Sequence, residues 1–478
     1  MLFHSPNFLI FMLLLLIPFY FWRRGRIPLL VMGNVIFYVA NGVGVLILFL
    51  SVTLVTFIVV HLMQREGWRW LFWVGIAVNA GNIIFYKYAL MLIDTAESLT
   101  GQSYLVTDQV KEWLTTEQGT TFMVVGISFY TFQLISYVID VRRGTTKPTK
   151  SFARFWVYIS LFPQLIAGPI LRGEELIPQL DKLAQKQIRW QEIRFGLYLV
   201  FIGLMKKVIL ADNLDSIVNP LFADIGALSA EQAWIAAYTF GFQIYFDFSA
   251  YSDMALGLGY LLGIRLIINF HTPYLSGNPS EFWTRWHISL SRWIRDYIYI
   301  GLGGNRKGAT RTLIHMFIAM LISGLWHGAM WHFVIWGAVH GLLLIVYKWT
   351  LELNRFDPIR ALRQHWLYRI VAIAVFFHIV TWTWVFFRAR NMGEALELTR
   401  LMLHVDVVAL LAHPYMPLVA GLFALHIFEY LLRRYETVSG RIWHWIPSPI
   451  RGTVYAALLF IVFYNMKGET YDFIYFQF

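Results

Sequence analysis

Long apolar stretches separated by short polar loops run along the whole chain. About twelve of them are long enough for membrane-spanning helices, which need roughly 17–25 mostly apolar residues. They lie near 5–22, 27–40, 45–63, 71–93, 119–141, 195–211, 232–263, 312–328, 330–347, 370–387, 417–432 and 452–466. The stretch Phe155–Leu171 is apolar too, but it lies in a polar region and is typical of a re-entrant or interfacial segment. The pattern predicts an all-α polytopic membrane protein forming one domain, 1–478, in which 452–478 is a final helix with an aromatic C-terminal segment.

Composition supports the membrane interpretation. Hydrophobic residues make up 58% of the chain and charged residues 14%, whereas soluble domains carry about 25% charged residues. The chain has no cysteine, which excludes disulfides, thiolate metal sites and cysteine nucleophiles. A net charge of +11 could indicate nucleic-acid binding in a soluble protein, but no nucleic-acid motif is present. An excess of Lys and Arg in cytoplasmic loops accounts for the charge.

Loop charges predict the orientation in the membrane. The segments 142–194 and 265–311 are basic and are expected in the cytoplasm, whereas 94–118 and 212–231 are acid-rich and are expected outside. Three arginines follow the first apolar stretch instead of preceding it, the reverse of a cleaved signal peptide, so this stretch is expected to stay as a first helix. Both termini then lie outside. The uncertain region is 312–347, where a re-entrant pair would reverse the later orientation.

The segment around His287 combines a helix start with a histidine. In Asn278–Glu281, Asn caps the helix, Pro occupies its first position, and Glu can reach back to the cap. At about 100° per residue, His287 falls on the apolar face beside Trp283 and Ile294. Two interpretations remain open: an amphipathic helix at the membrane surface with an incidental histidine, or a titratable ring that points into the protein interior.

Histidines also occur inside the apolar stretches near residue 330. His327 lies in one predicted span and His340 in the next, and both spans carry Gly-x-x-x-Gly spacing, which permits close helix packing. An ionisable residue at membrane depth is costly, so it is a candidate functional site. The alternative for His327 is a buried histidine bonded to a backbone carbonyl. A metal site built from His327, His332 and His340 lacks nearby Asp or Glu ligands, and no metal is predicted.

Four motifs resemble those of the membrane-bound O-acyltransferases. They are Gly126–Asp140, Phe162–Pro169, Tyr245–Asp253, and the pair formed by Arg285–His287 and Trp326–Gly328. The match is to the bacterial branch that acylates cell-surface glycans such as alginate, peptidoglycan and cellulose. The resemblance implies a ring of about 11–12 transmembrane helices with re-entrant or interfacial helices around a central tunnel. The acyl donor would enter the tunnel from the cytoplasm and the acceptor from the other side.

The resemblance also implies roles for individual histidines. His327 corresponds to the essential histidine of the family, and His287, 40 residues earlier, corresponds to its partner position. His340 matches a recurrent histidine of the bacterial branch, and its role would be a supporting one.

Two further groups of residues have candidate roles. Phe473–Phe478 resembles the C-terminal motif of a small single-span protein that accompanies the teichoic-acid D-alanylation acyltransferase, in which a tyrosine is proposed to carry the acyl group. Tyr475 is therefore a possible acyl relay, and an interfacial aromatic belt is the alternative. The basic residues before the eighth apolar stretch, 312–328, could hold the phosphates of coenzyme A or could reflect only the orientation bias. They are Arg285, Arg292, Arg295, Arg306, Lys307 and Arg311.

Together these features predict transfer of an acetyl group from cytoplasmic acetyl-CoA across the bacterial inner membrane for O-acetylation of an extracytoplasmic polysaccharide. His327 would act as a general base, and His287 would orient the thioester or stabilise the oxyanion. The acetyl group would pass through Tyr475, through a periplasmic partner resembling a serine esterase, or both. Membrane lipid and a surface glycan are the other expected partners. The alternatives are a transporter or flippase of an acyl carrier and a scaffold for a separate acetylating enzyme. The sequence does not identify the glycan.

Overall fold

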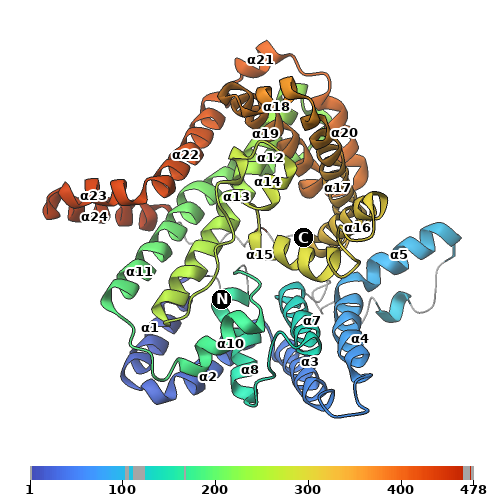
Figure 1. Ribbon diagram of the computed structural model, residues 1–478. Coiled ribbons are helices and arrows are strands. Elements are labelled where there is room, and N and C mark those ends of the chain that lie inside the picture. Colours follow the sequence, from blue (N-terminus) through green and yellow to red (C-terminus); the bar gives the residue numbers. More distant parts are fainter. Residues whose placement is uncertain (1–2, 103–106, 111–123, 166–167, 467–473, 475–478) are drawn as a thin grey trace. The chain divides into compact units, whose positions relative to one another are not determined.

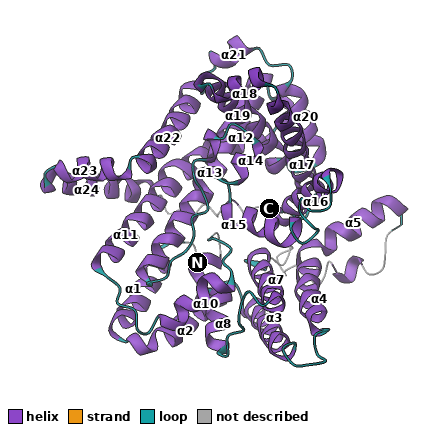
Figure 2. Ribbon diagram, in the orientation of Figure 1, coloured by secondary structure: helices purple, strands orange, loops and turns teal. Residues whose placement is uncertain are grey.

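The structure, a computed structural model, describes residues 3–102, 107–110, 124–165, 168–466 and Ile474 of the 478-residue chain. Every regular element in these residues is a helix, and none is a strand (Figure 2). The all-α prediction is confirmed.

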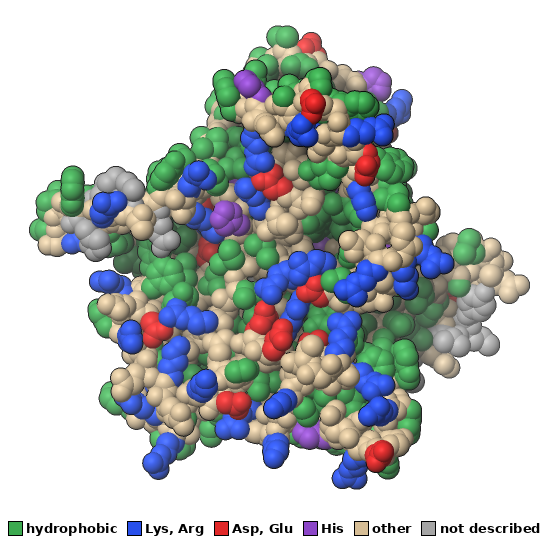
Figure 3. Space-filling model, viewed as in Figure 1, with side chains coloured by type: hydrophobic (Ala, Val, Ile, Leu, Met, Phe, Trp, Pro, Cys, Tyr) green, Lys and Arg blue, Asp and Glu red, His purple; other side chains and the backbone are tan. Residues whose placement is uncertain are grey.

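Six helical segments among the described residues are long and apolar enough, by length and composition, to cross a membrane. Each coincides with a predicted span, and they are Val43–Leu62, Leu71–Thr100, Ala309–His327, Trp331–Arg355, Trp366–Arg388 and Met416–Arg434. Large apolar side chains on their surfaces are exposed, such as Ile47 (58%) and Ile58 (46%) on α3 (Val43–Leu62). Exposed apolar surfaces of this kind suit lipid rather than water, and the chain is a polytopic membrane protein. The face in Figure 3 also carries many Lys and Arg side chains among its hydrophobic ones.

The remaining predicted spans are also helical where the structure describes them, but these helices are shorter or more polar. They are α1 (Pro6–Phe21), α2 (Arg26–Val39), α7 (Ile127–Arg143), α11 (Trp190–Met205) with the π-helical turn Lys206–Ala211, α13 (Ala230–Leu261) and α24 (Ser448–Asn465). The polar side chains of α13 are tolerated because this helix is buried along most of its length.

The chain divides into two compact units, whose helices can be followed in Figure 1. The first comprises Met1–Val200 with Asp253–Ile267, and the second comprises Phe201–Ser252 with Ile268–Phe478. Further helices of the first unit are α3 (Val43–Leu62), α4 (Leu71–Ile83), α5 (Ala89–Thr100), α8 (Phe152–Ser160), α9 (Phe162–Leu165) and α10 (Gly173–Lys182). Further helices of the second unit are α12 (Asp212–Ala223), α14 (Pro279–Trp283), α15 (Ile288–Trp293), α16 (Ala309–His327), α17 (Trp331–Glu352), α18 (Asp357–Gln364), α19 (Trp366–Arg388), α20 (Met392–Met402), α21 (Val407–Leu411), α22 (Met416–Arg434) and α23 (Glu436–Trp445).

Helices α16 and α17 form a tightly packed pair in the second unit. A Cβ atom on Gly324 would lie 2.2 Å from the carbonyl oxygen of Phe333, and one on Gly337 would lie 2.4 Å from that of Met320. Only glycine permits so close an approach, and the close packing predicted from the Gly-x-x-x-Gly spacing is confirmed. The contact fixes the last turn of α16, which ends at His327.

Candidate active site

The helix predicted around His287 is interrupted at the histidine itself. Asn278 caps α14 as expected, accepting a hydrogen bond of 2.9 Å from the backbone N–H of Glu281. The Glu281 carboxylate reaches one residue further back than predicted, to the N–H of Gly277 at 2.9 Å. His287 lies between α14 and α15 with φ of 40°, in the left-handed region. The prediction of one continuous helix is wrong, because a residue in this conformation ends a right-handed helix.

A buried asparagine holds the backbone around His287. The Asn269 Oδ1 atom accepts hydrogen bonds from the backbone N–H of Ser289 at 3.1 Å and from its hydroxyl at 2.7 Å. The carbonyl oxygen of Asn269 accepts a third from the N–H of Ile288 at 2.9 Å. Asn269 thereby supplies the N-terminal cap of α15 from a distant part of the sequence. Sequence reasoning missed it, since no local spacing links residues 20 positions apart.

The structure brings His287 and His327 together within the second unit. Their ring centroids are 6.4 Å apart, and their exposed fractions are 0% and 4%. The Trp326 ring contacts both, at 5.5 Å from His287 and 5.0 Å from His327. Burial lowers the pKa of His287 to about 3, so its imidazole is neutral at physiological pH. The two buried imidazole rings are close enough to contact the same small chemical group.

His340 lies one aromatic ring away from His327. The Trp336 ring is 5.1 Å from that of His327 and 4.6 Å from that of His340. The His340 Nε2 atom lies 3.1 Å from the Thr383 hydroxyl, which links α17 to α19. His340 therefore supports the aromatic wall beside His327. In the part of the chain that the structure describes, no group of three His, Asp or Glu residues could hold a metal ion.

The predicted coenzyme A cations differ in their surroundings. Arg285 pairs with Glu281 at 2.7 Å, and Arg295 pairs with Asp296 at 2.6 Å. The others are half-buried or exposed, and they are Arg292, Arg306, Lys307 and Arg311. Arg285 is therefore less available to an anionic ligand than the cations of the loop before α16.

A partly buried ionic cluster in the second unit has no counterpart in the sequence predictions. The Glu429 carboxylate on α22 pairs with Lys206 at 2.8 Å and Arg433 at 2.9 Å, and it accepts a hydrogen bond of 2.6 Å from the Tyr245 hydroxyl. A carboxylate inside a membrane-spanning segment is the signal that could have drawn attention to it.

A second ion pair involves the third of the four motifs. Lys207 pairs with Asp212 at 2.8 Å and with Asp247 at 2.9 Å. The other oxygen of Asp247 accepts a hydrogen bond of 2.7 Å from the backbone N–H of Ile474. Tyr475, the next residue, lies outside the described residues.

The region that holds His287 and His327 matches a known family. A family model for membrane-bound O-acyltransferases matches residues 148–387, half of the chain, including both histidines. A probable alginate O-acetylase from Pseudomonas putida is 36% identical over 406 residues, covering 83% of this chain and 79% of the relative. The chain belongs to the membrane-bound O-acyltransferase family.

Other relatives of this acyltransferase are named for related transfers. A peptidoglycan O-acetyltransferase from Helicobacter pylori is 32% identical over 419 residues, covering 82% of this chain and 72% of the relative. A teichoic acid D-alanyltransferase from Bacillus subtilis is 28% identical over 282 residues, covering 56% and 69%. The family and these names establish acyltransferase activity for the chain.

Proposed function

We propose that this acyltransferase O-acetylates an extracytoplasmic polysaccharide, with acetyl-CoA as the donor. The observation that carries the proposal is the buried pair His287 and His327, 6.4 Å apart inside the matched region. The relatives named for acetyl transfer to alginate and peptidoglycan support an acetyl group and a glycan acceptor. The enzyme resides in the bacterial inner membrane with both termini outside, as the loop charges predict.

His327 is the general base in this proposal. It takes the proton from the acceptor hydroxyl as the oxygen attacks the thioester carbonyl carbon. The carbon–sulfur bond breaks, and the coenzyme A thiolate leaves and receives the proton. Positioned proton transfer of this kind typically contributes about 10²–10⁴-fold to the rate. Trp326 and Trp336 beside the ring exclude water that would otherwise compete as acceptor.

His287 binds the carbonyl oxygen as negative charge develops on it. Because burial keeps its imidazole neutral, one ring nitrogen carries a proton to donate while the ring adds no charge to the site. A preorganised donor in a dry site stabilises an oxyanion strongly. A centroid separation of 6.4 Å lets the two rings contact one carbonyl group between them.

The donor and the acyl route complete the proposal. The coenzyme A phosphates bind the exposed cations Arg306 and Lys307, because Arg285 already has an ion-pair partner. Tyr475 accepts the acetyl group and passes it to a periplasmic partner with a serine nucleophile, or directly to the glycan. The hydrogen bond from the Ile474 N–H to Asp247 supports this relay, since it anchors the residue before the tyrosine in the interior of the second unit.

Acetyl transfer is tested with the purified protein in liposomes. Radiolabelled acetyl-CoA is supplied, and released coenzyme A is measured for the wild type, His327→Ala and the control His404→Ala, which changes an exposed histidine. We expect loss of release only in the first variant. Full acetyl transfer by His327→Ala would contradict the assignment of His327 as the general base. Transport of label without release of coenzyme A would indicate a transporter, and activity that needs neither histidine would indicate a scaffold.

The relay has a separate test. Mass spectrometry of protein quenched during turnover should find an acetyl group on the tyrosine at position 475. Tyr475→Phe should lose this adduct and the acetylation of the glycan. Normal glycan acetylation by Tyr475→Phe would discard the relay and leave the roles of the two histidines standing.

A further inference from the structure

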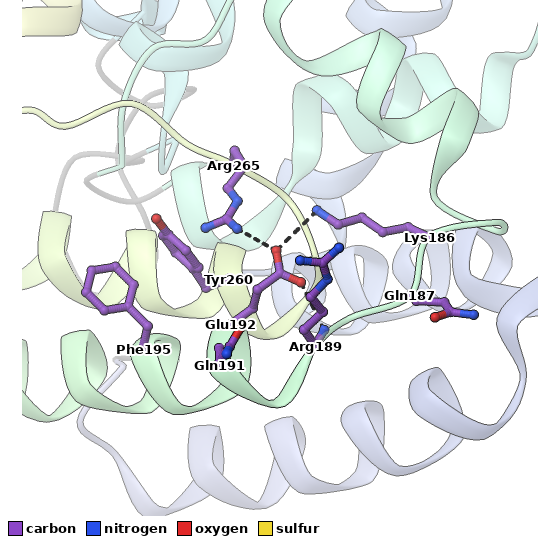
Figure 4. Close-up of a pocket in the computed structure, with 8 residues that line it drawn as sticks. All are labelled: Lys186, Gln187, Arg189, Gln191, Glu192, Phe195, Tyr260 and Arg265. Carbon is purple, nitrogen blue, oxygen red and sulfur yellow. Dashed lines mark hydrogen bonds and ion pairs between the residues drawn. The ribbon is translucent and has the colours of Figure 1, made fainter.

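The first unit contains a pocket that the proposed reaction does not use. The cavity has a volume of 440 Å³ and opens to the surface at the start of α11 (Figure 4). Three cationic side chains, one carboxylate and two aromatic rings dominate its wall, and they are Lys186, Arg189, Arg265, Glu192, Tyr260 and Phe195.

Side-chain hydrogen bonds hold the backbone at two of the cations. Arg26, only 2% exposed, donates to the carbonyl oxygens of Lys186 at 2.7 Å and Leu183 at 2.8 Å. The Gln179 side chain accepts from the backbone N–H of Arg265 at 2.8 Å and donates to its carbonyl oxygen at 3.0 Å. The fold therefore presents these cations from fixed positions, unlike scattered surface lysines.

The pocket carries more positive than negative charge. Glu192 pairs with Arg265 at 2.5 Å and Lys186 at 3.7 Å, and the Arg189 guanidinium lies beside this carboxylate (Figure 4). Burial opposes ionisation of Glu192, but the backbone N–H of Arg189 and the nearby cations lower its pKa. One carboxylate thus faces three cations, and the pocket attracts an anion.

An apolar surface begins at the rim of the pocket. The Arg265 guanidinium stacks 3.9 Å from the Tyr260 ring centroid, Tyr260 contacts Phe195 at 4.8 Å, and Phe195 stacks on Tyr198 at 6.2 Å. Tyr198 is 48% exposed, and Trp190 at the start of α11 is 67% exposed. Cations from the loops that precede α11 and follow α13 thus adjoin a row of aromatic rings, Tyr260 on α13 and then Phe195 and Tyr198 on α11.

We infer that this pocket binds the phosphate of an anionic phospholipid, whose acyl chains lie along the exposed side of α11. A phosphate diester satisfies the excess cations, and the row from Tyr260 to Tyr198 gives its chains an apolar surface. A free phosphate or a nucleotide would use the cations but would leave that row uncovered. The location also fits, because the loop charges predict that 142–194 faces the cytoplasm, where anionic lipids are recognised by basic pockets. The inference does not depend on the acyl donor.

Native mass spectrometry of the full-length protein with defined lipids tests the inference. We expect phosphatidylglycerol to bind more tightly than phosphatidylcholine. Replacing Lys186, Arg189 and Arg265 together by Gln should lower this preference by about tenfold or more, since each cation near a membrane surface contributes about fivefold. The control triple variant Arg142→Gln, Lys147→Gln and Lys150→Gln changes the same charge at exposed positions of the same unit and should keep it. Equal preferences in the two triple variants would overturn the inference.

A second variant is expected to gain lipid affinity, a result that misfolding could not produce. Glu192→Gln removes the anion that competes for the cations, so its preference for phosphatidylglycerol should rise several-fold. A fall or no change would contradict the inference. Competition separates the possible sources of the phosphate group: inorganic phosphate and acetyl-CoA at millimolar concentration should leave the lipid bound. Displacement by either compound would make this a site for soluble anions and would overturn the lipid assignment.

Discussion

Asn269 controls the geometry of His287 from outside the helix that follows the histidine, and Asn269→Ala isolates this control. The substitution removes both hydrogen bonds to Ser289 and keeps the backbone bond to Ile288. It alters neither histidine and none of the aromatic rings around them. The variant therefore changes how firmly the backbone at His287 is held and leaves its chemistry intact.

The magnitude follows from the contacts. Loss of a helix cap costs about 1 kcal/mol, and a buried donor left without its acceptor costs about 1–3 kcal/mol. Asn269 is 1% exposed and Ser289 is 2% exposed, so water cannot easily replace the lost acceptor. The left-handed conformation of His287 stores about 1–3 kcal/mol of strain. The free energy of the lost bonds is comparable to this strain, so the backbone at His287 should relax. If the displaced His287 ring then stabilises the transition state by about 1–2 kcal/mol less, turnover should fall about 5–30-fold.

The assay is release of coenzyme A from acetyl-CoA, with kcat and KM measured separately. We expect kcat to fall about 5–30-fold, with little change in KM for acetyl-CoA, and hydrogen exchange at the Ser289 amide to accelerate. The control Ser151→Ala removes a cap of the same kind from α8 in the first unit, where the Ser151 hydroxyl accepts from the Arg154 N–H at 3.3 Å. It should reduce stability and spare kcat per folded enzyme. Wild-type turnover and unchanged exchange in Asn269→Ala would refute the reasoning.

Three further predictions concern other parts of the second unit. Gly324→Ala should lower the melting temperature and the turnover, because its Cβ would meet backbone 2.2 Å away, whereas Gly421→Ala, with no atom within 4 Å, should be neutral in the same thermal assay. The free energy of unfolding should fall as the pH drops below about 6.5, because His287 takes up a proton in the unfolded chain but stays neutral in the folded protein until about pH 3. At pH 5 this difference costs about 2 kcal/mol, and His287→Gln should flatten that part of the plot of stability against pH. Glu429→Ala should destabilise the protein by about 1.5–3 kcal/mol in thermal or denaturant unfolding, because it removes the carboxylate that accepts hydrogen bonds from Lys206, Arg433 and Tyr245. A cost below about 1 kcal/mol, the value for exposed pairs, would contradict this.

The membrane architecture could be predicted well because a bilayer imposes a length and an apolar composition on every span. Four of the six apolar segments match predicted spans within a few residues at both ends, as at Val43–Leu62 for the stretch 45–63. Leu71–Thr100 and Trp331–Arg355 begin where predicted but extend beyond the predicted ends at 93 and 347. The helix start at Asn278 was also predictable, since capping depends on residues within one turn. Local rules were sufficient wherever the determining contacts were local.

The break at His287 was not predictable in this way. Hydrophobic periodicity reports only the average direction of side chains, and the sequence from Phe282 to Trp293 has the periodicity of one continuous amphipathic helix. The left-handed residue is stabilised by Asn269, whose bonds exist only after a distant segment has folded against α15. The partners of Glu429 were hidden for the same reason, because Lys206 and Tyr245 come from other helices.

The 40-residue interval between His287 and His327 identifies the pair but does not set its geometry. His327 is positioned by the close contact of α16 with α17, which two glycines allow. His287 is positioned by the clamp from Asn269 on a left-handed turn. These devices belong to different elements and share no residue, so each can be weakened while the other stays intact. Because the proposed reaction uses both rings in one transition state, weakening either device should reduce turnover more than it reduces stability.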